Sequence, residues 1–157
     1  MLFRSFGSAP RFRLEVFLPD EQSELHFDLR LFDQTASRIP QASWCSFQPM
    51  TVEPNAWRIE KLGQWISPLE VIARGNRTLH ATGRGVKYEA SDGTMLLETF
   101  DAPLVAPGAP ALLRFQDQQP RLEGGMHFNL HNNVWGTNFP AWYEGASRFR
   151  FVLRIDG

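Results

Sequence analysis

The sequence predicts an all-β protein: one antiparallel β-sandwich domain over residues 1–157, with little helix. Three observations support this prediction. Hydrophobic and polar residues alternate along many short segments, turn signals recur between them, and 11 Pro and 12 Gly interrupt the chain too often for long helices. The length suits one domain that buries a core without disulfides or metal. With 13 Phe and 5 Trp, few side chains can fill such a core.

The N-terminal part predicts an antiparallel hairpin. From Arg11 to Leu18 the hydrophobic residues Phe12, Leu14, Val16 and Leu18 share one face, and from Leu25 to Leu31 every second residue is again hydrophobic. The intervening Pro19-Asp20-Glu21 has turn composition. We therefore expect two paired strands, each with one buried face.

The middle of the chain is less regular, but it predicts several short strands. Turns are expected at Ser67-Pro68, at Gly75-Asn76 and at Asp92-Gly93, and a loop is expected from Pro103 to Pro110. The expected strands are Trp44–Phe47, Trp57–Leu62, Arg77–Ala81, Val86–Ala90, Thr94–Thr99 and Ala111–Phe115.

The last forty residues show the clearest alternation. Met126, Phe128 and Leu130 share a face, and the residues between them are polar. An irregular stretch from Asn132 to Trp142 follows. The final strand turns Phe149, Phe151 and Leu153 inward and Arg148, Arg150 and Arg154 outward.

Composition limits which binding partners and which cellular compartment we expect for this chain. A net charge of −1 lacks the basic excess that duplex binding needs, so we expect no nucleic-acid partner. No run of roughly 18 apolar residues predicts a membrane span. Cys45 is the only cysteine, and the start MLFRSFGSAP is a poor signal peptide, so a cytoplasmic location is expected.

Two groups of residues are candidates for ligand binding. His127, Asn129 and His131 form a polar row that suits sugar hydroxyls if the sheet face is open, or a merely solvated face. The segment NNVWGTNF offers amides and a stacking ring, although its asparagines equally suit an irregular loop. The full set of candidate ligand-binding residues is His127, Asn129, His131, Asn132, Asn133, Trp135, Asn138, Trp142 and Tyr143.

Catalytic and metal sites find little support. His127 and His131 lie about 13 Å apart on a regular strand, too far to share a zinc ion. The carboxylates form no recognisable catalytic pair, and no phosphate loop, dinucleotide motif, CxxC motif or nucleophile elbow occurs. We therefore expect no catalytic residue, no metal and no cofactor in this chain.

Four segments resemble the C-terminal part of an uncharacterised subgroup of proteins similar to family 38 glycoside hydrolases, the α-mannosidase type. The most specific is the NNVWGTNF core of the last segment. The segments are KLGQWISP (Lys61 to Pro68), GNRTLHATGRGV (Gly75 to Val86), FDAPLVAPG (Phe100 to Gly108) and GGMHFNLHNNVWGTNFPAWYEGASRFRFVL (Gly124 to Leu153).

The resemblance implies a sandwich of the galactose-mutarotase-like kind, as in the C-terminal super-sandwich of such glycosidases. In these enzymes the catalytic zinc and the nucleophilic Asp belong to an N-terminal barrel that this chain lacks. None of those residues matches a position here. The resemblance thus implies that the chain is a C-terminal part of a larger glycosidase-like architecture, with a missing catalytic barrel, as domain or separate chain, for its partner.

Three functions follow as hypotheses. The first is a non-catalytic accessory β-sandwich of a carbohydrate-active system, which supports or rims a sugar site and leaves a face apolar for its partner. The second is a free-standing carbohydrate-binding module. The third is a small sugar-acting enzyme of mutarotase type, with His80, His127 and His131 as candidate acids and bases.

Overall fold

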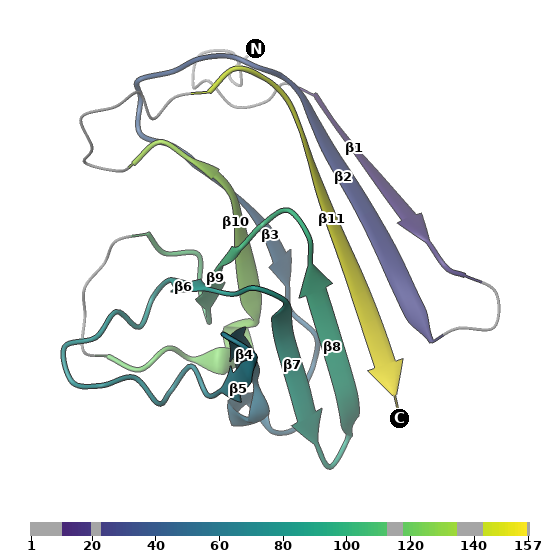
Figure 1. Cartoon of the computed structure of the whole chain (residues 1–157), viewed down its shortest axis with the longest axis vertical. Coiled ribbons are helices and arrows are strands. Elements are labelled where there is room, and N and C mark those ends of the chain that lie inside the picture. The colour runs from purple at the N-terminus through teal and green to yellow at the C-terminus, as the bar shows by residue number, and fades with distance from the viewer. Residues whose placement is uncertain (1–10, 20–22, 113–117, 135–142, 157) are drawn as a thin grey trace.

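The computed structural model describes residues 11–19, 23–112, 118–134 and 143–156. These residues form two antiparallel sheets and no α-helix, which confirms the all-β prediction (Figure 1). In order across the seven-stranded sheet lie β1 (Arg11–Phe17), β2 (Glu24–Gln34), β11 (Gly145–Asp156), β8 (Gly93–Thr99), β7 (Gly85–Ala90), β4 (Arg58–Lys61) and β5 (Gln64–Ile66). Across the four-stranded sheet lie β3 (Ala42–Phe47), β10 (Met126–Asn132), β9 (Leu104–Pro107) and β6 (His80–Ala81). Two short 3-10 turns, η1 (Pro54–Ala56) and η2 (Leu122–Gly124), lie between strands.

The first sheet joins the two ends of the described chain. β1 and β2 pair in continuous register from Arg11 opposite Phe32 to Phe17 opposite His26, so the predicted hairpin is confirmed. The C-terminal β11 then inserts between β2 and β8 and pairs with both. Because of this insertion, the outward arginines of β11 lie beside the polar residues of β2.

Two tight turns need backbone conformations with positive φ. The predicted β7–β8 hairpin forms, but it turns at Ser91 and Asp92, one residue before the expected Asp92-Gly93, and Gly93 follows with φ +128°. The β4–β5 hairpin turns at Leu62 and Gly63, with φ values of +52° and +83°. Positive φ at both central residues is typical of a type I′ turn, whose twist matches paired strands. The turn ends the expected strand Trp57–Leu62 near its predicted end, and the short strand β5 that follows it was not expected.

The core lies between the sheets and is rich in aromatic rings. The ring centroid of Phe151 in β11 lies 5.3 Å from those of Phe47 in β3 and Phe128 in β10. Farther along, Trp57 and Tyr88 pack at 5.5 Å. Offset and edge-on ring pairs at these distances add to the free energy gained from area burial.

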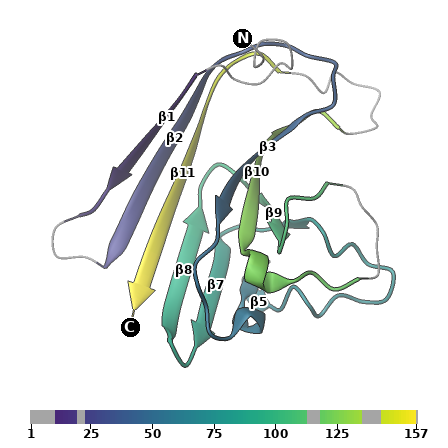
Figure 2. The ribbon, with the colours of Figure 1, turned by 180° about the vertical axis from the view of Figure 1, so that it is seen from behind.

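One row of hydrophobic side chains crosses β11, β2 and β1, and its exposure rises along the way. Phe151 lies opposite Phe27, which lies opposite Val16, so the three side chains share the core-facing side of the sheet. Phe151 is 1% exposed, Phe27 is partly buried, and Val16 is 48% exposed. Figures 1 and 2 show β1 as the outermost strand, on the side of β2 and β11 away from β3 and β10.

The expectation that β1 buries a hydrophobic face is therefore wrong. Phe12, Leu14 and Val16 are 71%, 52% and 48% exposed, and we call these three the overhang row. The alternation correctly assigned them to the core side, since they lie opposite Leu31, Leu29 and Phe27. They are exposed because the second sheet does not extend as far as β1 (Figure 2).

Three further expectations differ from the structure. β9 (Leu104–Pro107) forms where a loop was expected, because Pro107 occupies the end of the strand. Only His80 and Ala81 of the expected strand Arg77–Ala81 are paired. Ala111 and Leu112 lie outside any strand, and the remainder of the expected strand Ala111–Phe115 lies outside the described residues.

Candidate functional site

The polar row expected on an open sheet face is in fact buried. His127 and Asn129 in β10 are 2% and 6% exposed. The Nδ1 atom of His127 lies 2.7 Å from the hydroxyl of Ser46 on β3, and the backbone of Gly108 and Gly124 also interacts with its ring. The turn backbone and β3 cover His127, and Asn129 donates to the carbonyls of Ser43 and His131, so neither residue offers an open surface to a sugar.

A β-bulge removes His131 from this row. The pairing of β10 with β3 shifts between Asn129 and His131, so His131 lies opposite Ser43, which alternation places on the Cys45 side of β3. His127, opposite Ser46, lies on the other side. The regular alternation that put the two histidines on one face therefore fails at this point.

His80 does not complete a pair of catalytic histidines. It lies opposite Val105, which also pairs with Phe128, so His80 shares the core-facing side of the second sheet. His127 lies on the opposite face of that sheet. β9 separates β6 from β10, and strand spacing alone places His80 at least about 10 Å from every residue of β10, including His131. The structure thus brings no two of these histidines together for acid–base chemistry.

The side-chain amides of the asparagines at the end of β10 form hydrogen bonds within the chain itself. The Asn133 amide donates to the carbonyls of Ser37 (2.8 Å) and Ile39 (2.9 Å), and its oxygen accepts from the backbone N–H of Gln41 (2.7 Å). The Asn132 amide donates to Asn129 at 2.6 Å. The three Asn133 bonds hold the connection between β2 and β3, and the Asn132 bond lies within β10.

The aromatic part of the same segment is described only at its end. Trp135, Asn138 and Trp142 lie outside the described residues. Tyr143 is 44% exposed, its ring centroid lies 6.3 Å from that of His131, and its hydroxyl donates to the carbonyl of Ala146. Tyr143 is the one candidate of the original nine that the structure shows exposed.

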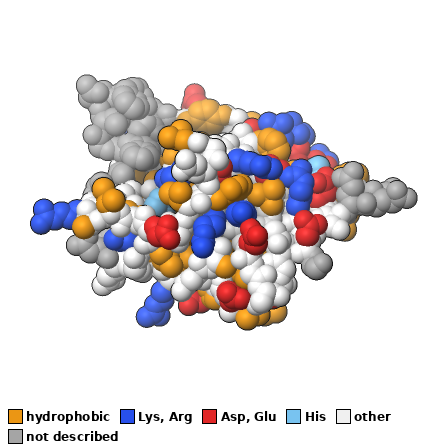
Figure 3. All heavy atoms as spheres, turned by 60° about the horizontal axis from the view of Figure 1, so that its bottom comes forward, with side chains coloured by type: hydrophobic (Ala, Val, Ile, Leu, Met, Phe, Trp, Pro, Cys, Tyr) orange, Lys and Arg blue, Asp and Glu red, His pale blue; other side chains and the backbone are white. Residues whose placement is uncertain are grey.

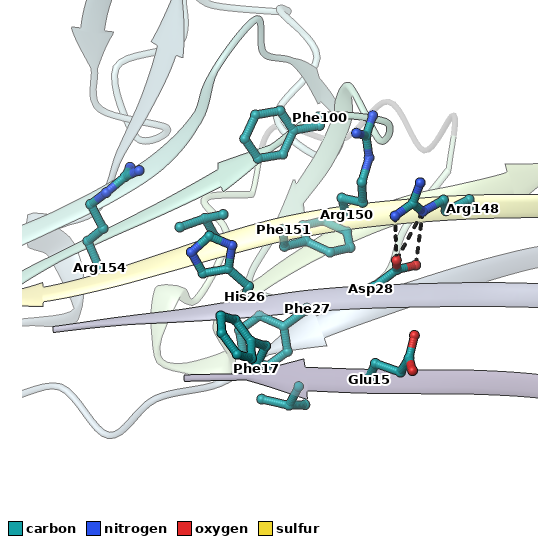
Figure 4. A pocket seen from close by; sticks show the side chains of 12 residues that line it. Glu15, Phe17, His26, Phe27, Asp28, Phe100, Arg148, Arg150, Phe151 and Arg154 are labelled. Carbon is teal, nitrogen blue, oxygen red and sulfur yellow. Dashed lines mark hydrogen bonds and ion pairs between the residues drawn. The ribbon is translucent and has the colours of Figure 1, made fainter. Parts of the chain in front are cut away.

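A groove lies elsewhere, on the outer face of β1, β2 and β11. It encloses about 630 Å³. Phe17 of β1 and Phe100, which follows β8, stand on opposite sides of it, with His26 between them (Figure 4). Both phenylalanine rings are largely exposed, at 62% and 59%. Arg148 and Arg154 lie toward opposite ends of the groove.

Each groove arginine on β11 is held by a carboxylate. Arg150 donates two parallel hydrogen bonds of 2.9 Å to the carboxylate of Asp101. Arg154 donates to Glu24 at 3.0 Å and also to Glu98. Two-bond pairing fixes the guanidinium plane, so these donors are oriented before any ligand arrives.

Asp28 is the most strongly perturbed carboxylate of the groove. Arg148 donates to it at 2.5 to 3.1 Å, and Arg30, two residues farther along β2, donates at 3.1 to 3.2 Å. The hydrogen bonds from Arg148 and then Arg30 hold the pKa of Asp28 well below its usual range. Its charge is thereby present at any physiological pH and is balanced locally.

The groove therefore combines aromatic rings with paired charges of both signs. Acidic and basic side chains are also interspersed on the face in Figure 3. Balanced charge favours a neutral polar ligand over a phosphate, because each guanidinium already has an anionic partner. Sugars fit such a site, since rings cover their apolar faces and fixed donors and acceptors bind their hydroxyls.

The part of the chain that the structure describes offers no cluster of metal ligands and no activated thiol. There, no three His, Cys, Asp or Glu side chains gather as metal ligands, and no helix has the length and apolar character to cross a membrane. Burial raises the pKa of the Cys45 thiol to about 11, which disfavours the nucleophilic thiolate.

The sequence predicted the strands that line the groove but did not predict that β11 lies beside β2. In the sequence, His26, Asp28 and Arg30 alternate with the hydrophobic residues of one expected strand, and the outward arginines belong to another expected strand more than a hundred residues away. Only the insertion of β11 beside β2 brings them together, and nothing local in the sequence reports that neighbourhood. The exposed Phe17, an aromatic residue on an otherwise polar strand face, was the available signal.

Comparison with known proteins adds no relative: no family model matches this chain, and a search of curated proteins finds no match.

Proposed function

We propose that this chain is a non-catalytic accessory β-sandwich of a carbohydrate-active system. It docks through the overhang row on a catalytic barrel of the α-mannosidase type and supports or rims the sugar site of that barrel. The observation that carries the proposal is the exposure of Phe12, Leu14 and Val16 on the core-facing side of the sheet.

The overhang row is placed as a docking surface would be. Its three side chains continue the apolar surface of Leu29 and Leu31, so the exposed patch and the domain core are contiguous. Contiguous apolar surface of this kind marks an interface more often than scattered exposed residues do. Covering the three side chains contributes roughly 1–2 kcal/mol each, since about half or more of each is now exposed.

The nature of the partner rests on the sequence resemblance. The segments that resemble family 38 glycoside hydrolases run from Lys61 to Leu153 and correspond to the sandwich of those enzymes, whereas zinc and nucleophile belong to their barrel. A barrel would supply the chemistry that no described cluster of this chain provides.

Direct binding tests the proposal. The probe is a family 38 catalytic barrel from the same genome, produced without its own C-terminal sandwich, and the readout is complex formation by sedimentation and calorimetry. We expect a complex with the unaltered chain and about 100-fold weaker binding after Phe12→Ser with Leu14→Ser, the loss of two buried side chains.

The matched control is Leu62→Ser with Ile72→Ser, which removes two side chains that are 102% and 82% exposed outside the overhang. This control should bind like the unaltered chain. The absence of any complex at about 100 µM, or equal binding by the overhang variant, would refute the proposal.

The groove favours a second candidate function, a carbohydrate-binding module. Here a glycan would lie between Phe17 and Phe100 and bind the arginine–carboxylate pairs. Calorimetry with mono- and oligosaccharides tests it: Phe17→Ala and Phe100→Ala should each abolish most of the heat, while Phe12→Ala, on the opposite face of the same strand, should not. Sugar binding that is unchanged in both groove variants would exclude the groove as the binding site. Trp135→Ala and Trp142→Ala would then test the aromatic rings that the sequence predicts as ligand contacts.

A further inference from the structure

β1 is an edge strand with an open outer side. Within the described residues it pairs with β2 alone, and every residue of it is exposed. A strand edge presents backbone N–H and C=O groups that can pair with another strand. Seven residues of regular extended backbone are enough for an added antiparallel strand.

We propose that two copies of this chain associate by antiparallel pairing of their β1 strands about a two-fold axis at Leu14. The sequence of β1, RFRLEVF, is self-complementary in this register. Leu14 lies opposite Leu14 of the second copy, Arg13 opposite Glu15, Phe12 opposite Val16, and Arg11 opposite Phe17. A two-fold axis makes each of these contacts except the central one occur twice.

Charge selects this register over its neighbours. On the outer face, Arg13 of each copy meets Glu15 of the other, and opposite charges at directly facing positions stabilise a sheet. Moving the axis to Arg13 would bring Arg11 opposite Glu15 but would place two arginines opposite each other at the centre, and moving it to Glu15 would place two glutamates there with no opposite-charge pair. Arg13 and Glu15 form an ion pair at 2.6 Å within the strand, and because both side chains are well exposed this pair can be exchanged for the pairs across the axis.

The apolar face agrees with the same register. An axis at Leu14, perpendicular to the sheet, keeps the overhang rows of both copies on one side. Phe12, Leu14 and Val16 then form continuous cross-strand pairs with their counterparts. Four strands, β2 and β1 of each copy, separate the two β11 strands, and this spacing of several times about 4.8 Å leaves room for both second sheets.

This association and the barrel complex both involve the overhang row, but only the association uses the backbone edge of β1 and the charges of Arg13 and Glu15. The variant Arg13→Glu distinguishes them: it should abolish self-association and leave the barrel complex intact. The side chains of Arg13 and Glu15 are 62% and 47% exposed, so charge reversal leaves the core untouched.

Sedimentation equilibrium with charge-reversal variants tests the pairing. The unaltered chain should dimerise, and Arg13→Glu and Glu15→Arg should each weaken the dimer about tenfold or more, because two facing pairs become like-charged. An equimolar mixture of these two variants should recover association, since each arginine then faces a glutamate across the axis. The double variant Arg13→Glu/Glu15→Arg should recover it as well.

Leu14→Lys places two like charges at the axis and should also give monomers, whereas Leu62→Lys, at a fully exposed turn, should not. Far-ultraviolet circular dichroism confirms that each variant is folded. A monomeric unaltered chain at about 500 µM, or a dimer indifferent to both single reversals, would overturn the inference. A mixture of the two reversed variants that stays monomeric would overturn it too.

Discussion

Acidification from pH 7 to pH 5 should weaken the fold through its buried histidines. His80, 6% exposed, is the clearest case. Burial, and then the charge of Lys61, lower its pKa from 6.5 to about 4, against the opposing effect of a hydrogen bond with the Arg77 backbone. Burial also lowers the pKa of His127 and of His131.

The sign follows from proton uptake. Between pH 6.5 and about 4 the unfolded chain binds a proton at position 80 that the folded chain does not, so stability falls as the pH falls. At pH 5 the difference amounts to about 2 kcal/mol for His80 alone. The paired carboxylates, such as Asp28, have lowered pKa values, so their contribution is lost in a more acidic range.

Urea unfolding followed by tryptophan fluorescence at pH 7 and pH 5 measures this effect. The variant His80→Asn keeps a polar group near the ring's Nδ1 position and cannot be protonated. It should lose about 2 kcal/mol of the difference in unfolding free energy between the two pH values. If the variant and the unaltered chain respond equally to pH, His80 is not held neutral by the fold and the reasoning is refuted.

Three other changes probe the core, a charged clamp and the asparagine cluster. Phe151→Ala should lower the free energy of unfolding by about 3–5 kcal/mol because it leaves a cavity beside two rings. Phe12→Ala should change the free energy of unfolding by less than about 0.5 kcal/mol. Equal losses of unfolding free energy for the two variants in chemical denaturation would contradict the difference in burial between Phe151 and Phe12. The Glu60 carboxylate accepts from three backbone N–H groups, of Gly63, Gly83 and Arg84, and its pKa is lowered chiefly by the bond from Gly63. Glu60→Gln should therefore lower the melting temperature at pH 7. The difference in melting temperature between this variant and the unaltered chain should be smaller at pH 3 than at pH 7. An equal difference at both pH values would contradict a stabilising role for the ionised Glu60 carboxylate. Asn133→Ala should cost about 1–3 kcal/mol by leaving its backbone partners unsatisfied, and amide exchange should quicken at Gln41; unchanged exchange there would show that the bonds are not structural.

Period-two alternation predicted the elements well because it reports which two sides a strand has. It located β1, β2, β10 and β11 within a few residues and assigned each side chain on β1 to the correct face. It could not report what covers a face. Phe12 is exposed because the second sheet ends short of β1, and His127 is buried because β3 and distant turn backbone surround it.

The candidate site was predicted less well for the same reason. Its histidines and asparagines were identified by type and spacing, but the bulge after Asn129 breaks the spacing, and no local residue pattern announces it. The groove depends on β11 pairing with β2, more than a hundred residues away in sequence. Contacts of such range are set by the global topology, which alternation alone leaves open.

Amide hydrogen exchange of the chain with and without the catalytic barrel tests the docking proposal most directly. Added protection should concentrate in β1 and the facing part of β2, around Phe12, Leu14 and Leu29, and should disappear in the Phe12→Ser/Leu14→Ser variant. Protection confined to the β7–β8 hairpin, or no change anywhere at saturating barrel, would contradict the account.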